Sequence, residues 1–465
     1  MHKLSWLALC MALSGCSQHS TYQRPELTIA PAWQQAEGAQ LATQAGLWWR
    51  EFHDPQLDKL VEAVLAANPD MHVAALKLKS ARLGAEQADT NLTPSANGTI
   101  AASGNKDLKT GKDTNSLGPS LSLSYEVDLW GKLASVRDQA SWEAAASEQD
   151  LASTRLLLIG NTLEQYWQLG YLGSAIALGE QQLANLTRTE QLTQTKYQAG
   201  AITRLDLAQA RQLLAGKQAE LASLKAQQEQ ARNALRLLLG RSSGPLEYAP
   251  ASLATQTIPE LAVGIPADVL ARRPDVKAAE LRLRKTLAKG DEIRTSFYPS
   301  LTLTGSASTA SDRLAQVLQN PVGTLGASLA LPFLEYNRTQ LAIESSELDY
   351  QIAETEFRKQ LYTALVEVED NLAARHYGQQ RLDYLQEQLS YAREANDWPR
   401  PASRRVQPAC KPGSMSRTDC GMPSRACWPS KKSSSPPLPK SIAPWVAAIA
   451  WRPDNASPQY SPLCL

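Results

Sequence analysis

The sequence has few of the residues from which compact cores and most enzyme sites are built. Aromatic residues make up 6% of its 465 residues, and phenylalanine occurs four times. No cysteine lies between residues 17 and 409, so no disulfide framework holds the main part of the chain. The five histidines are scattered without metal-ligand spacing, and no catalytic, cofactor-binding or phosphate-binding pattern occurs. The sequence therefore predicts no enzyme, no metal site and no cofactor.

An excess of one charge and a long apolar run are also missing. The net charge is +1 with 20% charged residues of both signs, which indicates no nucleic-acid partner. After the first 15 residues no apolar stretch reaches the 18 residues that a transmembrane helix needs. Alanine, leucine, glutamine and glutamate dominate long stretches instead, a composition typical of long helices.

The first residues resemble an export signal. Residues 1–15 are short and apolar after Lys3, and they lead into Leu13-Ser14-Gly15-Cys16. This resembles a bacterial lipobox, in which cleavage before the cysteine leaves a lipidated N-terminus. The alternative is an ordinary signal peptide with an incidental cysteine. We predict lipidation of Cys16. Ser17 and not Asp follows it, which by resemblance to other lipoproteins is compatible with export to the outer membrane, where several acyl chains would anchor stably.

Two parts of the chain repeat each other about 205 residues apart. Residues 69–95 match residues 274–300 without a gap, and residues 117–123 match residues 325–331 at a separation of 208. The alternative is chance similarity between two helices rich in alanine and leucine, but the ungapped span favours duplication. We predict an N-terminal segment at 16–65, a first repeat at 66–265 and a second at 266–397, each with a helix, two strands and a long helix.

The strands are predicted from alternation with a period of two. We place them at about 95–104, 117–126, 299–308 and 324–333. Leu121 and Leu123 fall on one face of the second strand, and the apolar face of the last includes Leu329, Leu331 and Phe333. The polar face is predicted to carry Ser120, Ser122, Ser124 and Thr302. Glu126 and Asp128 lie where the second strand leads into a helix, and roles as rim charges or helix N-terminal charges are favoured there over acid-base catalysis.

The long helices carry their own signals. Residues 132–198 contain no proline, and residues 204–240 show a heptad in which eight of ten positions from Leu207 to Leu238 are apolar. This pattern predicts a helix that packs along a partner as in a coiled coil. Between the two helices, Gly200 lies in a turn that needs a left-handed residue.

If the strands lie in a bilayer, the chain must form an oligomer. A membrane sheet has to close, because open edges leave backbone groups without hydrogen bonds. Four strands cannot close, since small membrane barrels need about eight. The alternative is a soluble α+β protein with two surface hairpins.

Several motifs resemble one known family. They are Tyr22-Gln-Arg-Pro25, Trp48-Trp49 through Asp54-Pro55, Tyr125-Glu-Val-Asp128-Leu-Trp130-Gly131-Lys132, Lys196-Tyr-Gln-Ala-Gly200 with Leu205-Asp206, Ile265-Pro266 through Arg272-Arg273-Pro274-Asp275, and Glu367-Val-Glu369-Asp370. In this order they cover residues 13 to about 397. The sequence is similar to the outer membrane factor family of TolC/OprM-like efflux channels, in its lipoprotein (NodT-like) branch.

The resemblance implies a mainly helical α+β fold. Three copies, each with four β-strands, would form a 12-stranded transmembrane β-barrel that continues as a periplasmic α-helical coiled-coil barrel. Drugs or other small molecules would pass through this homotrimer, while a periplasmic adaptor and an inner-membrane pump supply energy. Ser120, Ser122, Ser124 and Thr302 would face the lumen, and the tip residues Gly200, Arg204 and Asp206 would contact the adaptor. The rival hypothesis is a periplasmic lipoprotein scaffold or adaptor without a pore.

The tail does not fit either the repeat or the family. Residues 398–465 hold 13 of the 27 prolines, four of the six cysteines and no glutamate. We interpret them as an out-of-frame translation. Codons for residues 407–424 can be chosen so that the frame starting at the third base reads Ala-Gly-Leu-Gln-Ala-Trp-Leu-Asp-Val, a turn and a helix start. Residues 442–448 likewise permit Leu-Gly-Gly-Gly, with which the family ends. The alternative is a genuine disordered tail.

Overall fold

The computed structural model describes residues 19–25, 47–106, 108–111, 113–248, 272–309 and 321–397. Cys16 and residues 398–465 therefore lie outside the described residues. The elements, in chain order, are η1 (Trp48–Phe52), α2 (Pro55–Ala67), α3 (Pro69–Thr90), β1 (Ser95–Lys106), β2 (Asp113–Val127), α4 (Lys132–Gln198), α5 (Arg204–Leu238), α7 (Pro274–Ser296), β3 (Ser300–Thr309), β4 (Pro321–Ala330), η4 (Pro332–Leu334) and α8 (Tyr336–Asp397).

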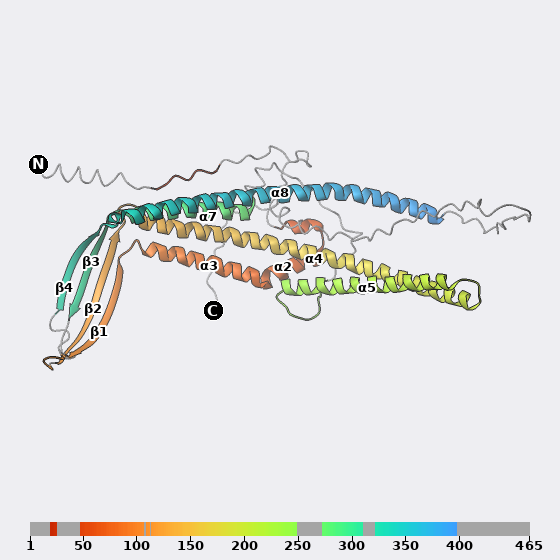
Figure 1. Cartoon of the computed structure of the whole chain (residues 1–465), viewed down its shortest axis with the longest axis horizontal. Coiled ribbons are helices and arrows are strands. Elements are labelled where there is room, and N and C mark those ends of the chain that lie inside the picture. The colour runs from red at the N-terminus through yellow and green to blue at the C-terminus, as the bar shows by residue number, and fades with distance from the viewer. Residues whose placement is uncertain are drawn as a thin grey trace, which may run out of the picture.

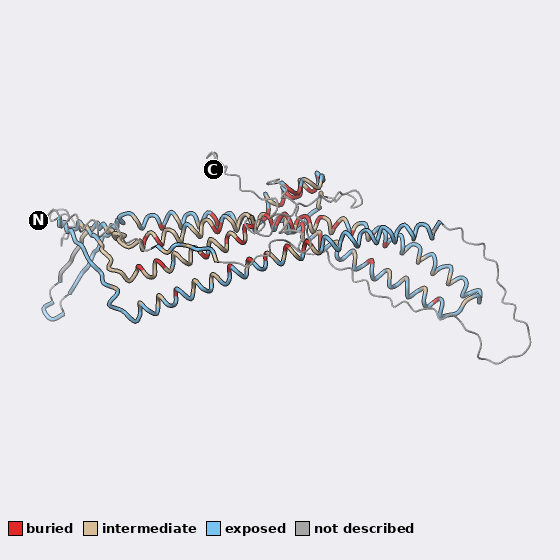
Figure 2. The backbone as a smooth tube through the Cα atoms, turned by 90° about the horizontal axis from the view of Figure 1, so that it is seen from above, coloured by how far each residue is buried: buried red, intermediate tan, exposed pale blue. Residues whose placement is uncertain are grey.

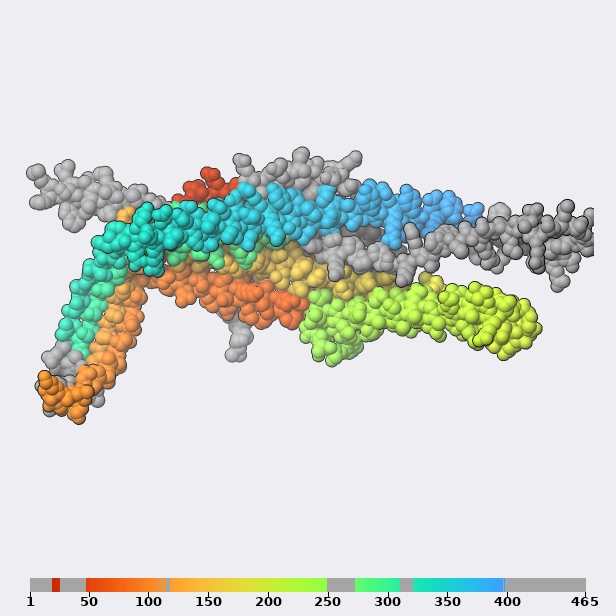
Figure 3. Space-filling view, in the orientation of Figure 1, coloured from red at the N-terminus to blue at the C-terminus, as the bar shows by residue number. Residues whose placement is uncertain are grey.

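The described chain is elongated, with a sheet at one end and a helical hairpin at the other (Figure 1). The helices lie side by side in the order α3, α4, α7 and α8, and α5 folds back along the far half of α4. The space-filling view shows the sheet projecting from one end of this helical layer (Figure 3). A helix, a hairpin and a long helix follow one another twice, as the predicted duplication requires.

The four strands form one antiparallel sheet in the order β1-β2-β3-β4. The first hairpin is longer than predicted, because the backbone ladder continues through polar residues to pair Lys106 with Asp113. The prediction for the last strand was wrong: it occupies residues 321–330 and not 324–333. Pro332 begins the short helix η4, since proline cannot donate to a strand ladder, so Leu331 and Phe333 lie outside the sheet.

Matching signals start the first helix of each repeat. Both α3 and α7 begin with a proline, Pro69 and Pro274, at a position where the missing N–H costs no helical hydrogen bond. Asn68 caps α3, and its side chain accepts from the backbone N–H groups of Asp70 and Met71. The same residue also donates to the Leu238 carbonyl at 2.9 Å, which ties the start of α3 to the end of α5.

Two apolar clusters hold the helices together, and the buried residues gather in the middle of the molecule (Figure 2). The larger cluster joins η1, α2, α4 and α5 around Trp49 and Tyr166. The smaller joins α7 to α8 through Leu283, Phe357 and Leu361. Among the described residues, no helix is both long and apolar enough to cross a membrane.

The predicted heptad of α5 is the stripe that packs on α4. All ten heptad positions are buried or half-buried, whereas most neighbouring positions are exposed. Leu221 shows how close the packing is: its methyl group lies 3.3 Å from where a Cβ on Gly179 would be. The stripe therefore serves the packing of the α4–α5 hairpin.

Candidate functional site

One face of the sheet is polar, as the alternation predicted. Ser120, Ser122 and Ser124 lie on it, and so does Thr302, because Glu126 of the same β2 face pairs with Thr302 of β3. Hydroxyl groups link the strands, with Thr99 and Ser120 oxygens 2.6 Å apart. The structure thus brings all four predicted residues onto one surface.

The opposite face of the sheet is apolar and exposed. Leu121 is 52% exposed and Leu325 is 92% exposed. None of the described helices lies over the sheet, which projects from the end of the helical layer (Figure 1). The cross-strand register places the exposed large residues of this face together: Ile100, Leu121, Leu123, Leu303, Leu325 and Leu329. A continuous apolar surface of this kind is typical of contact with lipid or another protein chain.

The two edges of the sheet are open. In the described chain β1 pairs only with β2, and β4 pairs only with β3. Each outer strand therefore presents a row of backbone groups that another strand has to pair. A copy of the same sheet offers matching edges.

The joint between β2 and α4 is built by the motif around Trp130. Asp128 accepts hydrogen bonds from the backbone N–H groups of Leu133 and Ala134, and Glu126 pairs with Lys132 at 2.7 Å. Asp128 thus has the helix N-terminal role favoured from the sequence, whereas Glu126 lies in β2 and is held by a side-chain ion pair. The Trp130 indole donates to the Pro299 carbonyl at 2.8 Å, which joins the two hairpins at their base.

A second motif locks α7 to α8. Arg273, which is 5% exposed, forms ion pairs of 2.7 Å with Asp275 and with Glu367 of α8. Burial alone would raise the pKa of Asp275, but the hydrogen bonds and charge of Arg273 outweigh it and hold this pKa below its usual value. The carboxylate therefore stabilises the fold at neutral pH and loses this effect as the pH falls through its lowered pKa.

The tip of the α4–α5 hairpin is a compact, capped turn. Gly200 has φ +70°, as predicted, and the Ala201 N–H donates to the Lys196 carbonyl at 2.9 Å. Asp206 closes a capping box with Thr203, whose hydrogen bond lowers the pKa of Asp206. This carboxylate is thus engaged within the turn, while Arg204 is exposed.

Leu205 was named from the sequence only as part of a family motif, and not among the individual tip residues expected to contact the adaptor. Its side chain is 66% exposed at the end of the hairpin. The heptad could have indicated the exposure of Leu205. Leu207 holds the buried heptad position, and a residue two positions earlier lies on a different face of the helix. Leu205 and Arg204 lie next to each other in a tip of which residues 195–201 and 203–206 are all exposed.

The far half of α8 has no partner among the described elements. Every described side chain from 374 to 395 is exposed, including Leu382, Leu385 and Leu389. In the first repeat the corresponding far half of the long helix is partly covered, because α5 packs along it and residues such as Leu172, Ile176 and Gly179 are buried there. The leucine stripe on the far half of α8 is therefore bare in the second repeat, whereas α5 covers part of the far half of α4 in the first (Figure 2).

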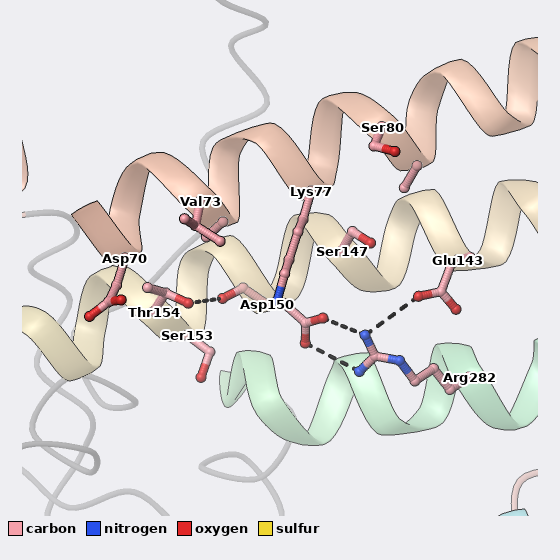
Figure 4. Close-up of a pocket in the computed structure, with 12 residues that line it drawn as sticks. Asp70, Val73, Lys77, Ser80, Glu143, Ser147, Asp150, Ser153, Thr154 and Arg282 are labelled. Carbon is pink, nitrogen blue, oxygen red and sulfur yellow. Dashed lines mark hydrogen bonds and ion pairs between the residues drawn. The ribbon is translucent and has the colours of Figure 1, made fainter. Parts of the chain in front are cut away.

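An open groove of about 750 Å³ lies between α3, α4 and α7 (Figure 4). Arg282 crosses it to form ion pairs with Asp150 and Glu143, and hydrogen bonding to Asp150 raises the pKa of Arg282. These charges clamp α7 to α4. In the part of the chain that the structure describes, no three His, Cys, Asp or Glu side chains are placed to hold a metal ion.

The family follows from a comparison with known proteins. Residues 60–241 and 265–400 match the family model described as outer membrane efflux protein. The chain belongs to the outer membrane efflux protein family. The family match ends close to residue 397, where the change in composition begins. Members of this family are outer-membrane transport channels, and their place is the outer membrane with an extension into the periplasm.

Similar proteins and similar solved structures support the same family. The chain is 30% identical over 407 residues to the pyoverdine export outer membrane protein OpmQ of Pseudomonas aeruginosa, covering 82% of this chain and 85% of OpmQ. It is 29% identical over 395 residues to the toluene efflux pump outer membrane protein TtgC of Pseudomonas putida, covering 82% and 81%. The open state of the Neisseria gonorrhoeae MtrE outer membrane channel superimposes with a TM-score of 0.73 at 26% identity, covering 82% and 86%.

Proposed function

We propose that this chain is the outer-membrane channel subunit of a tripartite efflux pump and that it conducts drugs or other small molecules passively from the periplasm to the exterior. The observation that carries the proposal is the two-faced sheet with open edges at the end of a long helical layer. Three copies bring twelve strands, enough to close a membrane sheet whose single copy cannot close. The partners are a periplasmic adaptor, an inner-membrane pump and outer-membrane lipid.

A planar bilayer tests the pore directly. We expect the purified trimer to produce discrete conductance steps, because the polar sheet face would line a water-filled passage. A trimer that inserts and gives no step would contradict the channel and favour a periplasmic scaffold. The exposed apolar face of the sheet argues against the scaffold, since a protein surrounded by water rarely keeps such a surface open.

The polar face would line the lumen. Ser120, Ser122, Ser124 and Thr302 offer hydroxyl groups and no enclosed pocket, so selectivity in this part of the passage would be modest. The apolar face would meet lipid at the same depth. This assignment follows from the alternation of side chains along each strand.

The tip of the α4–α5 hairpin would contact the adaptor. Arg204 and Leu205 are exposed there, and Gly200 shapes the turn that presents them. Asp206 would act indirectly, because its carboxylate holds the capping box.

Charge reversal tests this contact. We expect Arg204→Glu to weaken adaptor capture roughly tenfold, since an interface charge would be replaced by its opposite. Arg188→Glu on the exposed surface of α4 is the matched control, with the same charge change farther from the tip. If the two variants capture the adaptor equally well in a pull-down, the tip is ruled out as the contact.

Lipid on Cys16 would anchor the chain to the outer membrane. The proposal rests on the Leu13-Ser14-Gly15-Cys16 motif. Incorporation of labelled palmitate that is lost in Cys16→Ser would support it, and no incorporation in the unchanged protein would refute it.

The tail would be a translation in the wrong frame. The bare stripe on α8 supports this, because the duplication calls for a counterpart of α5 at this place. The shifted frame of residues 407–424 permits Ala-Gly followed six residues later by Leu-Asp. The first repeat has the same spacing, from Ala199-Gly200 to Leu205-Asp206. In its present form the product would lack one helix of its second hairpin.

A further inference from the structure

The turn between β1 and β2 lies at the end of the sheet farthest from the helices (Figures 1 and 3). The two strands stay paired up to Lys106 and Asp113, and residues 108–111 of the turn are described. Among the described residues of the sheet and this turn, the charged side chains are Lys106, Lys109 and Asp113 at the far end and Glu126 near the helices. The described sheet between its two ends is therefore uncharged.

The far end lies about one membrane thickness from the base of the sheet. Tyr125 marks the base, where the Trp130 ring also lies 5.3 Å from the ring of Tyr298. Asp113 precedes Tyr125 by 12 residues on β2, which is a path of about 40 Å along the strand. A strand tilted by about 40° covers roughly 30 Å of height over this path. The hydrocarbon core of a bilayer is about as thick, so Asp113 and its partner Lys106 lie at the outer boundary of a membrane that the sheet spans.

Aromatic residues are missing from this outer boundary. Residues 95–124 and 300–331 contain no Phe, Trp or Tyr. Membrane barrels commonly carry aromatic girdles at both boundaries, because an amphipathic ring suits the level of the headgroups. In this chain the aromatic residues of the sheet region lie at its base, as Tyr125 and Trp130 do. Another kind of side chain has to serve the far end.

Lys106 lies on the apolar face of the sheet, because it is six positions from Ile100 along β1. A lysine there can lay its stem along the apolar surface and keep its ammonium at the polar level. Its pair with Asp113 is 3.9 Å long, and the two side chains are 65% and 66% exposed. Leu108 is 93% exposed between Lys106 and Lys109, and Lys109 is exposed as well. The far end thus presents ammonium groups beside an apolar side chain.

The far end also carries a net positive charge. Lys106 and Lys109 outweigh Asp113, and the sequence neighbours Asp107 and Lys112 have opposite charges that leave this sum unchanged. Three copies in a trimer carry the charge three times. A positive rim attracts anionic headgroups within about a Debye length of the surface.

We propose that the far end of the β1–β2 hairpin binds the phosphate groups of the phosphorylated glycolipid in the outer leaflet, with Lys106 and Lys109 as the cationic contacts. The inference rests on the proposed channel, since it requires that the sheet span the membrane. An ammonium group donates charge-assisted hydrogen bonds to phosphate oxygens. Leu108 beside the lysines favours a lipid over a soluble polyanion, because an exposed leucine gains from contact with acyl chains.

The test titrates the purified full-length chain in detergent with fluorescent lipopolysaccharide. Lys106→Glu combined with Lys109→Glu reverses both charges. Lys225→Glu combined with Lys359→Glu is the matched control, because it makes the same charge change on the exposed surfaces of α5 and α8. Lys106→Arg combined with Lys109→Arg keeps the charge and separates its loss from damage to the hairpin. Dephosphorylated lipopolysaccharide and inorganic phosphate are the comparison ligands.

We expect charge reversal at the far end to raise the dissociation constant on the order of 10-fold, while the control and the arginine variant bind as the unchanged protein does. Removal of phosphate from the glycolipid should weaken binding to a similar extent, and inorganic phosphate should not compete. Equal binding by the two glutamate variants would overturn the proposal. Binding that survives dephosphorylation would overturn it too, and competition by inorganic phosphate would show a site for soluble anions instead.

Conductance in planar bilayers keeps this proposal apart from the proposed channel. Conductance steps from the unchanged chain, together with equal glycolipid binding by the two glutamate variants, would refute the headgroup site alone. The absence of steps would refute the channel on which the inference rests.

Discussion

Inserting one base pair between codons 397 and 407 is expected to turn this chain into an assembled trimer that supports efflux. The insertion moves the reading frame to the third base of the present codons. That frame permits the turn and helix start that the duplication places after α8. The restored helix would cover Leu382, Leu385 and Leu389 as α5 covers its side of α4.

The expected effect is large because several big side chains would leave water together. Burying a fully exposed leucine contributes about 1.5–3 kcal/mol, and these three are 41–50% exposed, so covering them contributes roughly 2–4 kcal/mol to the second hairpin. Without a partner helix, the far half of α8 is only marginally stable in water, because most of the stability of a helix comes from packing. We therefore expect the present chain to give little SDS-resistant trimer and the restored chain to give mostly trimer.

Drug susceptibility of a strain without its own outer-membrane channel measures the functional result. The matched control is an insertion of three base pairs at the same place, which adds one residue and keeps the present frame. Equal susceptibility with the one-base and three-base insertions would contradict the frameshift. Sequencing the gene across codons 390–465 shows independently whether a Leu-Gly-Gly-Gly ending exists in the other frame.

Leu121→Arg is expected to prevent insertion, whereas Ser122→Arg leaves insertion intact. The two residues are neighbours on β2, but they lie on opposite faces of the sheet. A charged side chain on the lipid face costs about 2–4 kcal/mol near the bilayer centre, and a trimer carries it three times. The same side chain on the lumen face remains in water.

The pair of variants separates membrane insertion from simple damage to the strand. Trimer in isolated outer membranes is the first readout, and bilayer conductance of Ser122→Arg is the second. We expect Ser122→Arg to insert and to conduct cations less well, because three positive charges would surround the passage. Insertion of both variants to the same extent would refute the assignment of the two faces.

Local patterns in the sequence predicted the elements well, for reasons that lie within each segment. Period-two alternation located the two faces of β2, and the heptad from Leu207 located the stripe that packs on α4. Gly200 marked the left-handed turn. The last strand was displaced by three residues, because the apolar alternation continued through Leu331 and Phe333 past the proline that ends the ladder.

The amino-acid sequence by itself thus determined the long helices, the duplication, the polar and apolar strand faces and the family. Only the tertiary structure decided how the family motifs act. Trp130 joins the two hairpins through Pro299, Arg273 locks α7 to α8, and the Ser20 backbone N–H donates to Asp291 of α7. Each of these contacts joins residues from 94 to 271 positions apart. Periodicity reports only on neighbours one or two turns away, so such contacts follow from the packing of the whole chain.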